Sequence, residues 1–511
     1  MKEKTANSRI AKNTILLYIR MLLLMGVALY TSRVVLDTLG VEDYGLYNVV
    51  GGIVTMFTFL SSAMGASSQR FITFILGKND AKELKAVFNT TCLVHWILAL
   101  LIFALSATIG LWFLYKKMVI PENRFDAALW VYIFSVLSCL VSVISIPYNA
   151  LVIAHEKMGI FSFISVLYAI VKLGVVFIVK HTGFDHLIFY AGLLLIAQIS
   201  ERLAYQFYCK AKFPESRGRS LKDTMQVKKM MSFAGWSLLP NLATVCYSQG
   251  INILLNLFFG PAVNAARGIS VQIQGVVKNF ITNFQTAVSP QIIKSYALGD
   301  SERLFSLIFK SSRLSFYLLL CIALPIFLEA DYLLSIWLKE VPQHSASFVR
   351  LIILAIVLDP LANPLCVANN ATGNVKLFKM CESAICLLVI PIGYTLLKIG
   401  LSPESVFVTQ VILSIIVQIA RVMLSKNTLH FTYKDYLQKV LVYIVRVGVI
   451  SIIIPVIFKI YLNNTFISFM TIVALSVLSV VATTYTLGLS QGERRSINGK
   501  IYSFLSKSKS K

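Results

Sequence analysis

Apolar runs long enough to cross a bilayer recur along almost the whole chain, and the polar breaks between them are mostly short. Because 57% of the residues are hydrophobic and only 14% are charged, the chain has too little polar surface to coat a soluble globule. A spanning helix needs about 20 mostly apolar residues, so the sequence predicts an all-α, multi-pass membrane protein of about fourteen transmembrane helices. The expected spans cover residues 13–36, 44–69, 86–114, 126–153, 159–179, 186–208, 231–259, 262–289, 306–330, 347–371, 377–398, 403–424, 437–461 and 465–489.

The chain begins with a basic segment, MKEKTANSRIAKN, that leads directly into the first apolar run. That run is too long for the core of a signal peptide and lacks a clear small-residue cleavage site, so we expect it to be retained as the first span. The eight cysteines fall mostly inside apolar runs and form no C-x-x-C pair. We interpret them as small packing residues, and we expect neither a disulfide framework nor a metal site.

The distribution of basic residues predicts the orientation of the chain in the membrane. The formal net charge is +24. When alternate loops are assigned to one side, about 32 Lys and Arg fall on the side of the N-terminus, against about seven on the other side. The positive-inside rule then predicts that both termini are cytoplasmic. Since topology accounts for most of the excess charge, we do not expect a nucleic-acid partner.

The two halves of the sequence are related to each other. The motifs LGV and YG within residues 39–45 have counterparts, FGP and NA, within residues 259–265, and two further pairs of motifs follow in the same order. Each half holds six expected spans and starts in the cytoplasm, which predicts parallel repeats about an axis along the membrane normal. The expected divisions are an N-terminal lobe at 1–209, a cytoplasmic linker at 210–230, a C-terminal lobe at 231–426, two appended spans at 427–492 and a cytoplasmic tail at 493–511.

Several cations lie inside the expected spans. Arg20 and Arg33 belong to the first span, and Lys172 lies in the middle of the fifth, with Tyr168 on the same face of the helix. A charged side chain near the bilayer centre costs about 2.5–3.5 kcal/mol on insertion scales, so such residues usually face the bundle interior or a water-filled cavity. For Arg33 an alternative stays open, because Asp37 lies one helical turn later and could pair with it.

Polar residues also follow one face of the seventh and eighth spans, at intervals of three or four positions. On the eighth span Arg267 and Lys278 are about 16 Å apart along the helix, with no anion on the same face. We therefore expect these two cations to face a wet cavity, whereas the small polar residues could simply join helices through hydrogen bonds. The polar residues expected to line a cavity are Asn48, Asn241, Ser248, Asn252, Gln274 and Gln285.

Acidic residues inside the spans are few. Asp359 directly precedes Pro360, and it could either carry a coupling ion or pair with a nearby Lys or Arg. On the outer side, Asp37, Glu42 and Asp43 could hold a metal in a membrane glycosyltransferase, but such enzymes have larger external loops than this chain. Because the histidines are scattered and no phosphate-binding loop occurs, we expect neither a catalytic site nor a cofactor.

Four segments resemble a known family. They are SRVVLDTLGVEDYGLYNVVGG, SSQRFITFILGKND, IPYNALVIAHEKM and FFGPAVNAARGISVQI. Together they resemble the Wzx-type flippases, the polysaccharide-transporter branch of the multidrug/oligosaccharidyl-lipid/polysaccharide exporter superfamily, over essentially the whole chain. The resemblance implies two six-helix lobes that form a V around a central cavity, with two extra C-terminal helices.

The resemblance also implies a function. Such a protein moves undecaprenyl-diphosphate-linked oligosaccharide, the repeat unit of O-antigen, capsule or exopolysaccharide, from the inner to the outer leaflet of a bacterial cytoplasmic membrane by alternating access. Its partners would be this lipid-linked diphosphate, membrane lipids and the polysaccharide polymerase and chain-length machinery. A cavity that contains more cations than anions suits such an anionic substrate. The residues expected to bind the diphosphate are Arg20, Arg33, Lys172, Arg267 and Lys278.

Three other functions compete with this one. A drug or cation antiporter of the same fold would need acidic residues in its cavity, for which only Asp359 and Asp37 are available. A lipid II flippase has nearly the same substrate chemistry. A membrane polymerase or glycosyltransferase would need large external loops.

Overall fold

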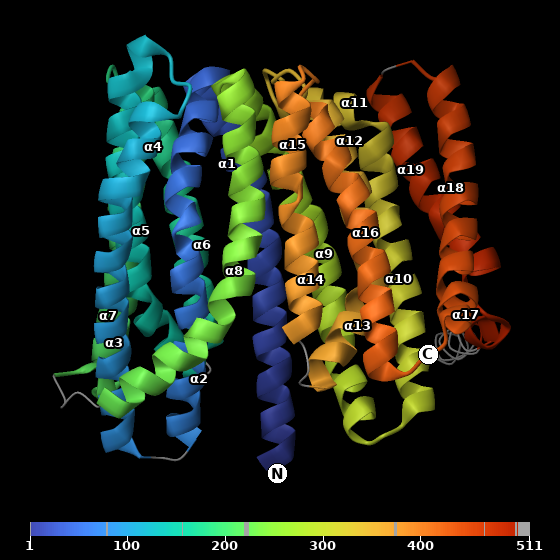
Figure 1. Ribbon diagram of the computed structural model, residues 1–511, viewed down its shortest axis with the longest axis horizontal. Coiled ribbons are helices and arrows are strands. Elements are labelled where there is room, and N and C mark those ends of the chain that lie inside the picture. The colour runs from blue at the N-terminus through green and yellow to red at the C-terminus, as the bar shows by residue number, and fades with distance from the viewer. Residues whose placement is uncertain are drawn as a thin grey trace, which may run out of the picture. The chain divides into compact units, whose positions relative to one another are not determined.

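The computed structural model describes residues 2–77, 80–155, 157–218, 224–372, 376–463, 465–495 and 498. The side chains it describes begin at Arg20 in the first helix and at Leu242 in α8. The described residues form helices joined by short loops, and no strand occurs among them (Figure 1). Linker residues 219–223 and most of the expected tail lie outside the described residues.

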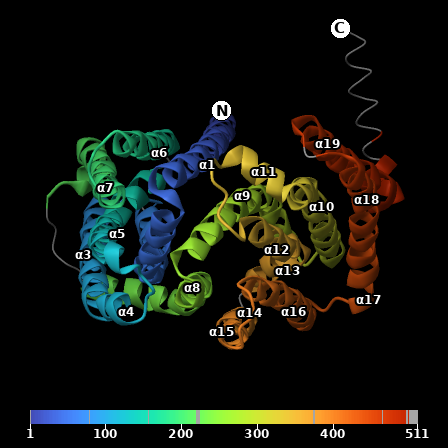
Figure 2. The same cartoon turned by 90° about the horizontal axis from the view of Figure 1, so that it is seen from above.

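The chain divides into two compact units. Unit 1 contains Met1–Ile269, Leu338–Gln343 and Gly393–Pro403. Within unit 1, α5 packs along α7 and α1 along α6 (Figure 2). Helix α2 packs along α8. Its helices are α1 (Lys2–Met56), α2 (Thr58–Gly77), α3 (Ala81–Leu105), η1 (Ser106–Gly110), α4 (Leu111–Lys116), η2 (Glu122–Arg124), α5 (Phe125–Ala154), α6 (Met158–Lys180), α7 (His186–Lys212), η3 (Pro214–Ser216), α8 (Thr224–Phe259) and the first part of α9 (Pro261–Ala297).

Unit 2 contains Ser270–Trp337, His344–Ile392 and Glu404–Lys511. Here α16 packs against α12, α13 and α14, and α10 packs against α13 and the pair formed by α18 and α19. Besides the rest of α9, its helices are α10 (Ser301–Leu328), α11 (Ala330–Trp337), α12 (Ser345–Val357), α13 (Asp359–Thr372), α14 (Lys376–Leu387), α15 (Val389–Lys398, which ends in unit 1), α16 (Glu404–Leu429), α17 (Tyr433–Tyr436), η4 (Leu437–Leu441), α18 (Val442–Tyr461), α19 (Phe466–Thr483) and η5 (Thr484–Gly488).

Two glycines explain the shape of α1. Gly40 has φ 78° and ψ 172°, a conformation that interrupts the helix and that residues with a Cβ rarely adopt. The interruption separates the first expected span from the second, and α2 continues the second. A Cβ at Gly45 would lie only 1.8 Å from the carbonyl oxygen of Pro261, so only glycine allows this approach. Two of the motifs that carry the family resemblance therefore meet inside unit 1.

The helices carry apolar residues on their buried faces and also on their exposed faces. In unit 1, Val50, Val131 and Leu187 are fully buried in one apolar cluster, and Ile308 and Val447 belong to the corresponding cluster of unit 2. The opposite faces are also apolar. On α18, for example, the exposed residues recur every fourth position, with Val449 at 60%, Ile453 at 50% and Ile457 at 47% exposure. Water would not favour such faces, whereas the hydrocarbon of a bilayer does.

Eleven helices in the described part of the chain are long and apolar enough to cross a membrane, or up to twelve if α12 and α13 form one bent span. The bend of 40° between α12 and α13 falls where Pro360 follows Asp359, since proline removes a backbone donor and restricts the residue before it. The prediction of an all-α, multi-pass membrane protein is confirmed. Helix α9, with its polar stripe, is not among the eleven, and the number of fourteen spans and the repeat relation remain predictions.

Candidate functional site

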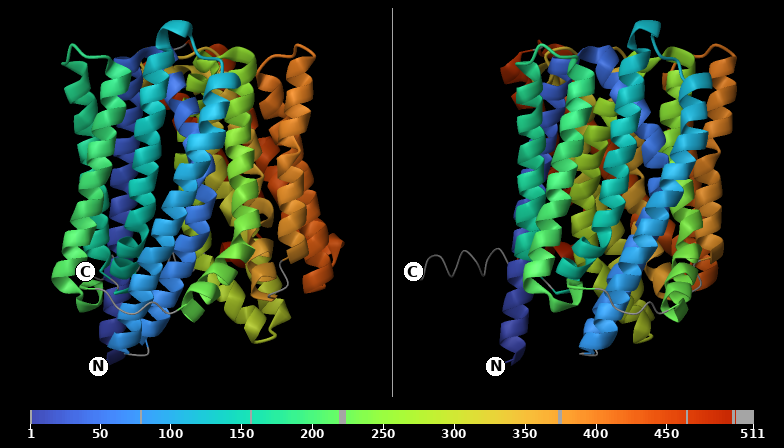
Figure 3. Two further views of the ribbon diagram at one scale, coloured as in Figure 1. Left: turned by 60° about the vertical axis from the view of Figure 1, so that its left-hand side comes forward. Right: turned by 90° about the vertical axis from the view of Figure 1, so that its left-hand side faces the viewer.

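Unit 1 contains a cavity of about 270 Å³ inside its membrane-spanning helices. Its walls come from α1, α2, α5, α6 and α7, which run side by side through the unit (Figure 3). Hydroxyl groups dominate the polar part of the wall, and one amine and one amide join them. The polar lining residues are Tyr47, Thr55, Thr58, Ser61, Ser135, Ser138, Ser142, Tyr168, Lys172 and Gln198.

Lys172 is the cation of this cavity, as the sequence predicted for the middle of the fifth span. Its Nζ lies 5.5 Å from the centroid of the Tyr168 ring. The Tyr168 hydroxyl donates to Oε1 of Gln198 over 2.7 Å, and Nε2 of Gln198 donates to Oε2 of Glu201 over 2.9 Å. Among the described residues no carboxylate lies within ion-pair distance of Lys172. The ammonium therefore faces a hydroxyl-lined space without an ion pair, although Glu201 attracts it from beyond ion-pair distance. Such a space can accept an anion that also carries hydroxyl groups.

Arg20 lies on α1, one of the helices that form this cavity, but it is not among the lining residues. Its Nε donates to the Ser165 hydroxyl over 2.6 Å, and its guanidinium carbon lies 4.4 Å from the centroid of the Phe161 ring. Both of these partners are neutral, and Glu201 of α7 attracts the guanidinium without forming an ion pair with it.

Arg33 does not pair with Asp37, the alternative that the sequence left open. Asp37 instead accepts hydrogen bonds from Lys180 over 3.0 Å and from Lys339 over 2.7 Å. Arg33 is half-buried and makes no hydrogen bond or ion pair within the described part of the chain.

Asp43, from the acidic group on the expected outer side, is also neutralised by a cation. The Arg124 guanidinium donates to both Asp43 and Asp185. Burial by itself would raise the pKa of Asp185, but the bonds from Arg124 and from the Ile188 N–H outweigh it and hold that pKa below its ordinary value. Together with the lysines on Asp37, this arrangement makes Asp37 and Asp43 parts of ion pairs.

The polar stripe of α8 and α9 forms a buried hydrogen-bonded cluster at its unit 1 end. Nη2 of Arg267 donates to the carbonyl of Ser248 over 2.5 Å, while its Nε has no partner among the described residues. Nδ2 of Asn264 donates to Asn252, and Nδ2 of Asn252 donates to the Asn48 carbonyl over 3.1 Å. Asn48, Ser248, Asn252 and Arg267 are thus brought together, and the amides join helices as polar groups commonly do in membranes. The Asn241 side chain lies outside the described residues.

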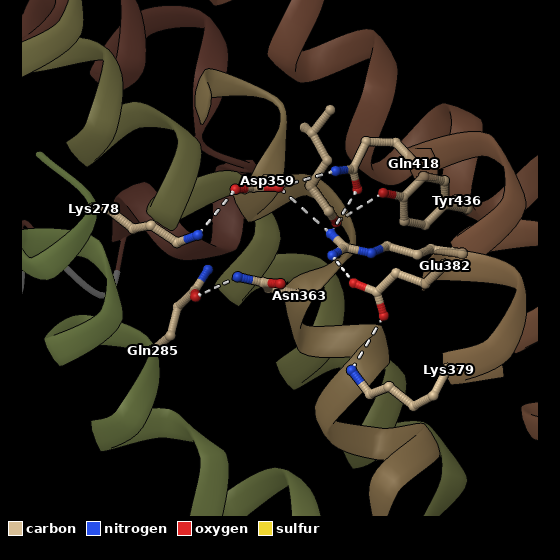
Figure 4. Close-up of polar contacts among 10 residues, drawn as sticks. Lys278, Gln285, Asp359, Asn363, Lys379, Glu382, Gln418 and Tyr436 are labelled. Atoms are coloured by element: carbon tan, nitrogen blue, oxygen red, sulfur yellow. Dashed lines mark hydrogen bonds and ion pairs between the residues drawn. The ribbon is translucent and has the colours of Figure 1, made fainter. Parts of the chain in front are cut away.

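The other end of the α9 stripe belongs to unit 2 and meets an acid. Lys278 is 62% exposed, and its Nζ lies 3.9 Å from Oδ2 of Asp359 (Figure 4). Gln285 lies two helical turns further along the same face of α9 and accepts a hydrogen bond from Nδ2 of Asn363 over 3.0 Å. Gln274 is half-buried and makes no hydrogen bond within the described part of the chain. The anion that was missing from the stripe itself is therefore supplied by another helix.

Asp359 belongs to a charged network that crosses four helices of unit 2. Nη1 of Arg421 lies 3.7 Å from Oδ1 of Asp359, and Nη2 of Arg421 donates to Glu382. Glu382 also pairs with Nζ of Lys379 over 3.1 Å (Figure 4). The side chains of Arg421 and Glu382 are only 11% and 18% exposed. Asp359 thus takes the role of a partner for nearby cations. Sequence reasoning missed Arg421, because its partners are 39 and 62 positions away.

These geometries describe a helical membrane protein with a polar, cation-containing interior, which is the architecture of a transporter. Solved structures share its fold. A multidrug resistance MATE family transporter of the MOP superfamily, in an inward-facing conformation, has a TM-score of 0.68 at 14% identity, over 82% of this chain and 98% of that chain. The lipid II flippase MurJ, in an inward closed conformation, has a TM-score of 0.72 at 13% identity, over 92% of this chain and 98% of that chain. A MOP superfamily transporter from Pyrococcus furiosus has a TM-score of 0.61 at 15% identity, over 82% and 96% of the two chains.

At these identities the likeness defines the fold alone: the chain has the fold of the MOP superfamily transporters. The sequence profile of the polysaccharide biosynthesis protein family matches residues 10–296, more than half of the chain. The chain therefore belongs to the polysaccharide biosynthesis protein family, and the family expected from the sequence is confirmed. No curated protein matches it significantly in sequence.

Proposed function

We propose that this protein is a flippase that moves an undecaprenyl-diphosphate-linked oligosaccharide repeat unit across a bacterial cytoplasmic membrane. The single observation that supports this proposal most directly is the unit 1 cavity, where Lys172 stands unpaired among hydroxyl groups. A diphosphate requires cations and a sugar requires hydrogen-bonding groups, and this wall offers both. Membership of the polysaccharide biosynthesis family supports the same class of substrate.

In this proposal the protein binds and releases its substrate without breaking a bond, so it acts as a transporter and not as an enzyme. Lys172 replaces part of the water around the diphosphate, Arg20, Arg33 and Arg267 of the same unit are proposed as its further cations, and the cavity hydroxyls replace the water around the sugars. With the inside of the membrane negative, outward movement of an anion is favoured by roughly 2.3 kcal/mol per charge per 100 mV. The reaction can therefore proceed without strict coupling to a proton or sodium ion.

The proposed orientation follows from the distribution of basic residues. Both termini lie in the cytoplasm, and the end of the molecule that carries Asp37 and Asp43 faces the outer side. Reporter tags at the two termini, tested for protection in intact cells, check this directly: both must be protected. The polysaccharide polymerase and chain-length machinery are proposed as partners on the outer side.

The decisive experiment measures transport in proteoliposomes. The lipid-linked oligosaccharide diphosphate is placed in the inner leaflet, and its arrival in the outer leaflet is followed with the intact protein and with Lys172→Gln. We expect the variant to transport at least about tenfold more slowly, because it loses a charge-assisted contact with the diphosphate. Lys180→Gln removes a cation from the same helix outside the cavity, and we expect it to retain most of the transport activity.

Two further substrates separate the competing functions. Lipid II in the same assay tests a lipid II flippase, and a cationic dye tests a drug or cation antiporter. The hydrogen-bonded chain from Tyr168 through Gln198 ends at the carboxylate of Glu201, which does not line the cavity. We therefore expect no dye transport. Dye transport without movement of either lipid-linked diphosphate would overturn the proposed function.

A further inference from the structure

A second cavity lies in unit 2, apart from the residues used so far. It has a volume of about 570 Å³ and lies between the first turns of α10, the segment around α17 and η4, and residues after η5. The start of α10 and α17 are at the same end of unit 2 (Figure 1). The charged lining residues are Glu302, Lys310, Arg313, Asp435, Lys439 and Glu493.

The length of α10 places this cavity at the membrane surface. The helix runs from Ser301 to Leu328 over 28 residues, or about 42 Å at 1.5 Å per residue. The hydrocarbon core is about 30 Å thick. The charged residues of α10 lie only between Glu302 and Arg313, so the excess length belongs to the N-terminal end and the first two turns project beyond the core. Glu302 is then in the water layer, and Arg313 is close to the hydrocarbon boundary. This is the depth at which lipid head groups lie.

Arg313 is a buried charged residue of the cavity wall. Its side chain is buried, with 6% of the residue exposed, and Nη2 donates to Oε1 of Glu493 over 2.7 Å. Its guanidinium carbon lies 4.7 Å from the centroid of the Tyr443 ring. The buried Nε has no hydrogen-bond partner among the described residues. A buried donor without a partner costs free energy, and a ligand with an acceptor oxygen would remove that cost.

The charges of the wall balance each other. Three cations stand against three carboxylates, and two of the pairs are already formed, Arg313 with Glu493 and Lys439 with Asp435. Lys310 and Glu302 are exposed and form no ion pair within the described part of the chain. A purely anionic ligand would meet as many repulsive as attractive groups. A zwitterion meets attraction at both of its ends.

The order of these charges along α10 matches a particular zwitterion. From the membrane outward, the helix presents Arg313, then Lys310, and then Glu302, which lies about 12 Å above Lys310 along the axis. Both side chains are long and shorten that gap. In a phospholipid with an amino head group, the phosphate is nearer the hydrocarbon and the ammonium is nearer the water. The cations therefore lie at the depth of the phosphate and the carboxylate at the depth of the ammonium.

An aromatic wall completes the cavity. The rings of Phe305 and Phe309 have their centroids 6.0 Å apart, and Phe305 lies 6.0 Å from Phe431. Aromatic side chains are enriched at this depth because they suit a boundary that is apolar on one side and wet on the other. They provide a surface for the glycerol and upper acyl region of a lipid.

We propose that this cavity binds the head group of a phosphatidylethanolamine molecule, with Lys310 and Arg313 at its phosphate and Glu302 at its ammonium. The site is independent of the transport function, because it uses none of the residues assigned to the substrate. It ties one lipid of the surrounding leaflet to the α10, α18 and α19 group of unit 2.

The test uses the full-length protein in nanodiscs that contain equal amounts of phosphatidylethanolamine and phosphatidylglycerol. Lipids that remain bound after gentle release are counted by native mass spectrometry. We expect the intact protein to retain phosphatidylethanolamine about tenfold over phosphatidylglycerol, the factor that one charge-assisted hydrogen bond supplies. Glu302→Lys should reverse this preference, because it replaces the partner of the ammonium with a cation. Lys310→Ala should lower retention of both lipids.

Arg303→Ala is the matched control, because Arg303 is exposed beside Glu302 but does not line the cavity. Its retention should equal that of the intact protein, and thermal unfolding verifies that each variant is folded. Phosphatidylcholine, whose amine cannot donate hydrogen bonds, should be retained less than phosphatidylethanolamine. Equal retention of all three lipids by the intact protein, or an unchanged preference in Glu302→Lys, would overturn the proposal. Binding of soluble phosphoethanolamine as tight as that of the lipid would overturn the assignment to a lipid.

Discussion

The cavity of unit 1 and the charged network of unit 2 treat their intramembrane cations in opposite ways. In unit 1, Lys172 faces hydroxyl groups and has no carboxylate within ion-pair distance among the described residues. In unit 2, Arg421 is held between Glu382 and Asp359, and Lys278 is directed at the same Asp359. The charge of Lys172 is available to a ligand, whereas Arg421 already forms ion pairs within the protein.

This difference means that a count of cations does not identify a binding site. A buried charge that has lost water must recover its interactions from the protein or from a ligand. Where the protein supplies them, removal of the charge damages the fold. Where the protein does not supply them, removal of the charge weakens ligand binding and raises the free energy of unfolding. Stability measurements can therefore separate the two kinds of cation without any knowledge of the substrate.

The largest effect is expected for Arg421→Met. This variant leaves the carboxylates of Glu382 and Asp359 without their shared partner in a site where Arg421 is only 11% exposed. Breaking a buried pair in this way typically costs about 3–5 kcal/mol. Thermal unfolding in detergent should therefore show a strongly destabilised protein. Arg350→Met is the control, because its partner Asp331 is 72% exposed, and we expect it to cost less than about 1 kcal/mol.

The second effect concerns a cation of unit 1 that is paired. Arg124→Gln removes the partner of both Asp43 and Asp185, and we expect it to lower the free energy of unfolding at pH 7 by about 2 kcal/mol. A variant as stable as the intact protein would contradict the rule that a paired cation supports the fold in whichever unit it lies.

The same pair gives a pH dependence. The pKa of Asp185 is lower in the folded protein than its ordinary value of about 3.9, so its stabilising contribution is complete above that value and is lost as the pH falls further through the folded pKa. In Arg124→Gln the part of that contribution that Arg124 supplies should be absent at every pH, while the bond from the Ile188 N–H remains. The difference between the unfolding curves of the two proteins should therefore shrink as the pH falls below about 4, and a difference that stays constant there would contradict the assignment.

The third effect has the opposite sign. Lys172→Met removes an unpaired ammonium from a half-buried position, so we expect the free energy of unfolding to rise by about 1 kcal/mol. A loss of stability comparable to that of Arg421→Met would show that Lys172 is structural. The two units would then use their cations alike.

The smallest effect is expected for Lys278→Gln. Lys278 is 62% exposed and lies 3.9 Å from Asp359, a contact too open and too long to add much to stability. Unfolding should shift by less than about 0.5 kcal/mol, so any loss of transport in this variant reports on substrate binding alone. A large loss of stability would place Lys278 with Arg421 in the structural network.

The fold was predictable from sequence because its main signal is local. Runs of apolar residues and the change to polar residues at their ends mark helices whatever those helices pack against. The same locality allowed Lys172 and Tyr168 to be placed on one helix face, and the structure brings them together. The break at Gly40 also leaves a local mark, since glycine followed by a change of pattern indicates a turn.

The pairing of charges was not predictable, because partners come from distant parts of the chain. The stripe on α9 carries no anion, and nothing in its spacing reveals that Asp359 approaches Lys278 from α13. Arg33 is one helical turn from Asp37, yet Asp37 forms its ion pairs with Lys180 and Lys339. Periodicity assigns a residue to a face of its helix, whereas only the packing of helices decides what stands opposite that face.

Unit 1 includes two short segments, Leu338–Gln343 and Gly393–Pro403, that the ribosome makes long after the rest of that unit. Lys339 in the first segment pairs with Asp37, and Tyr394 in the second packs against Phe258 with ring centroids 5.6 Å apart. Synthesis proceeds at about 5–20 residues per second, so unit 1 stays incomplete for roughly ten seconds after Ile269 has been added. During that interval Asp37 has only Lys180 as its partner and the Phe258 ring lacks Tyr394, and a chain truncated after Ile269 would be expected to keep both defects.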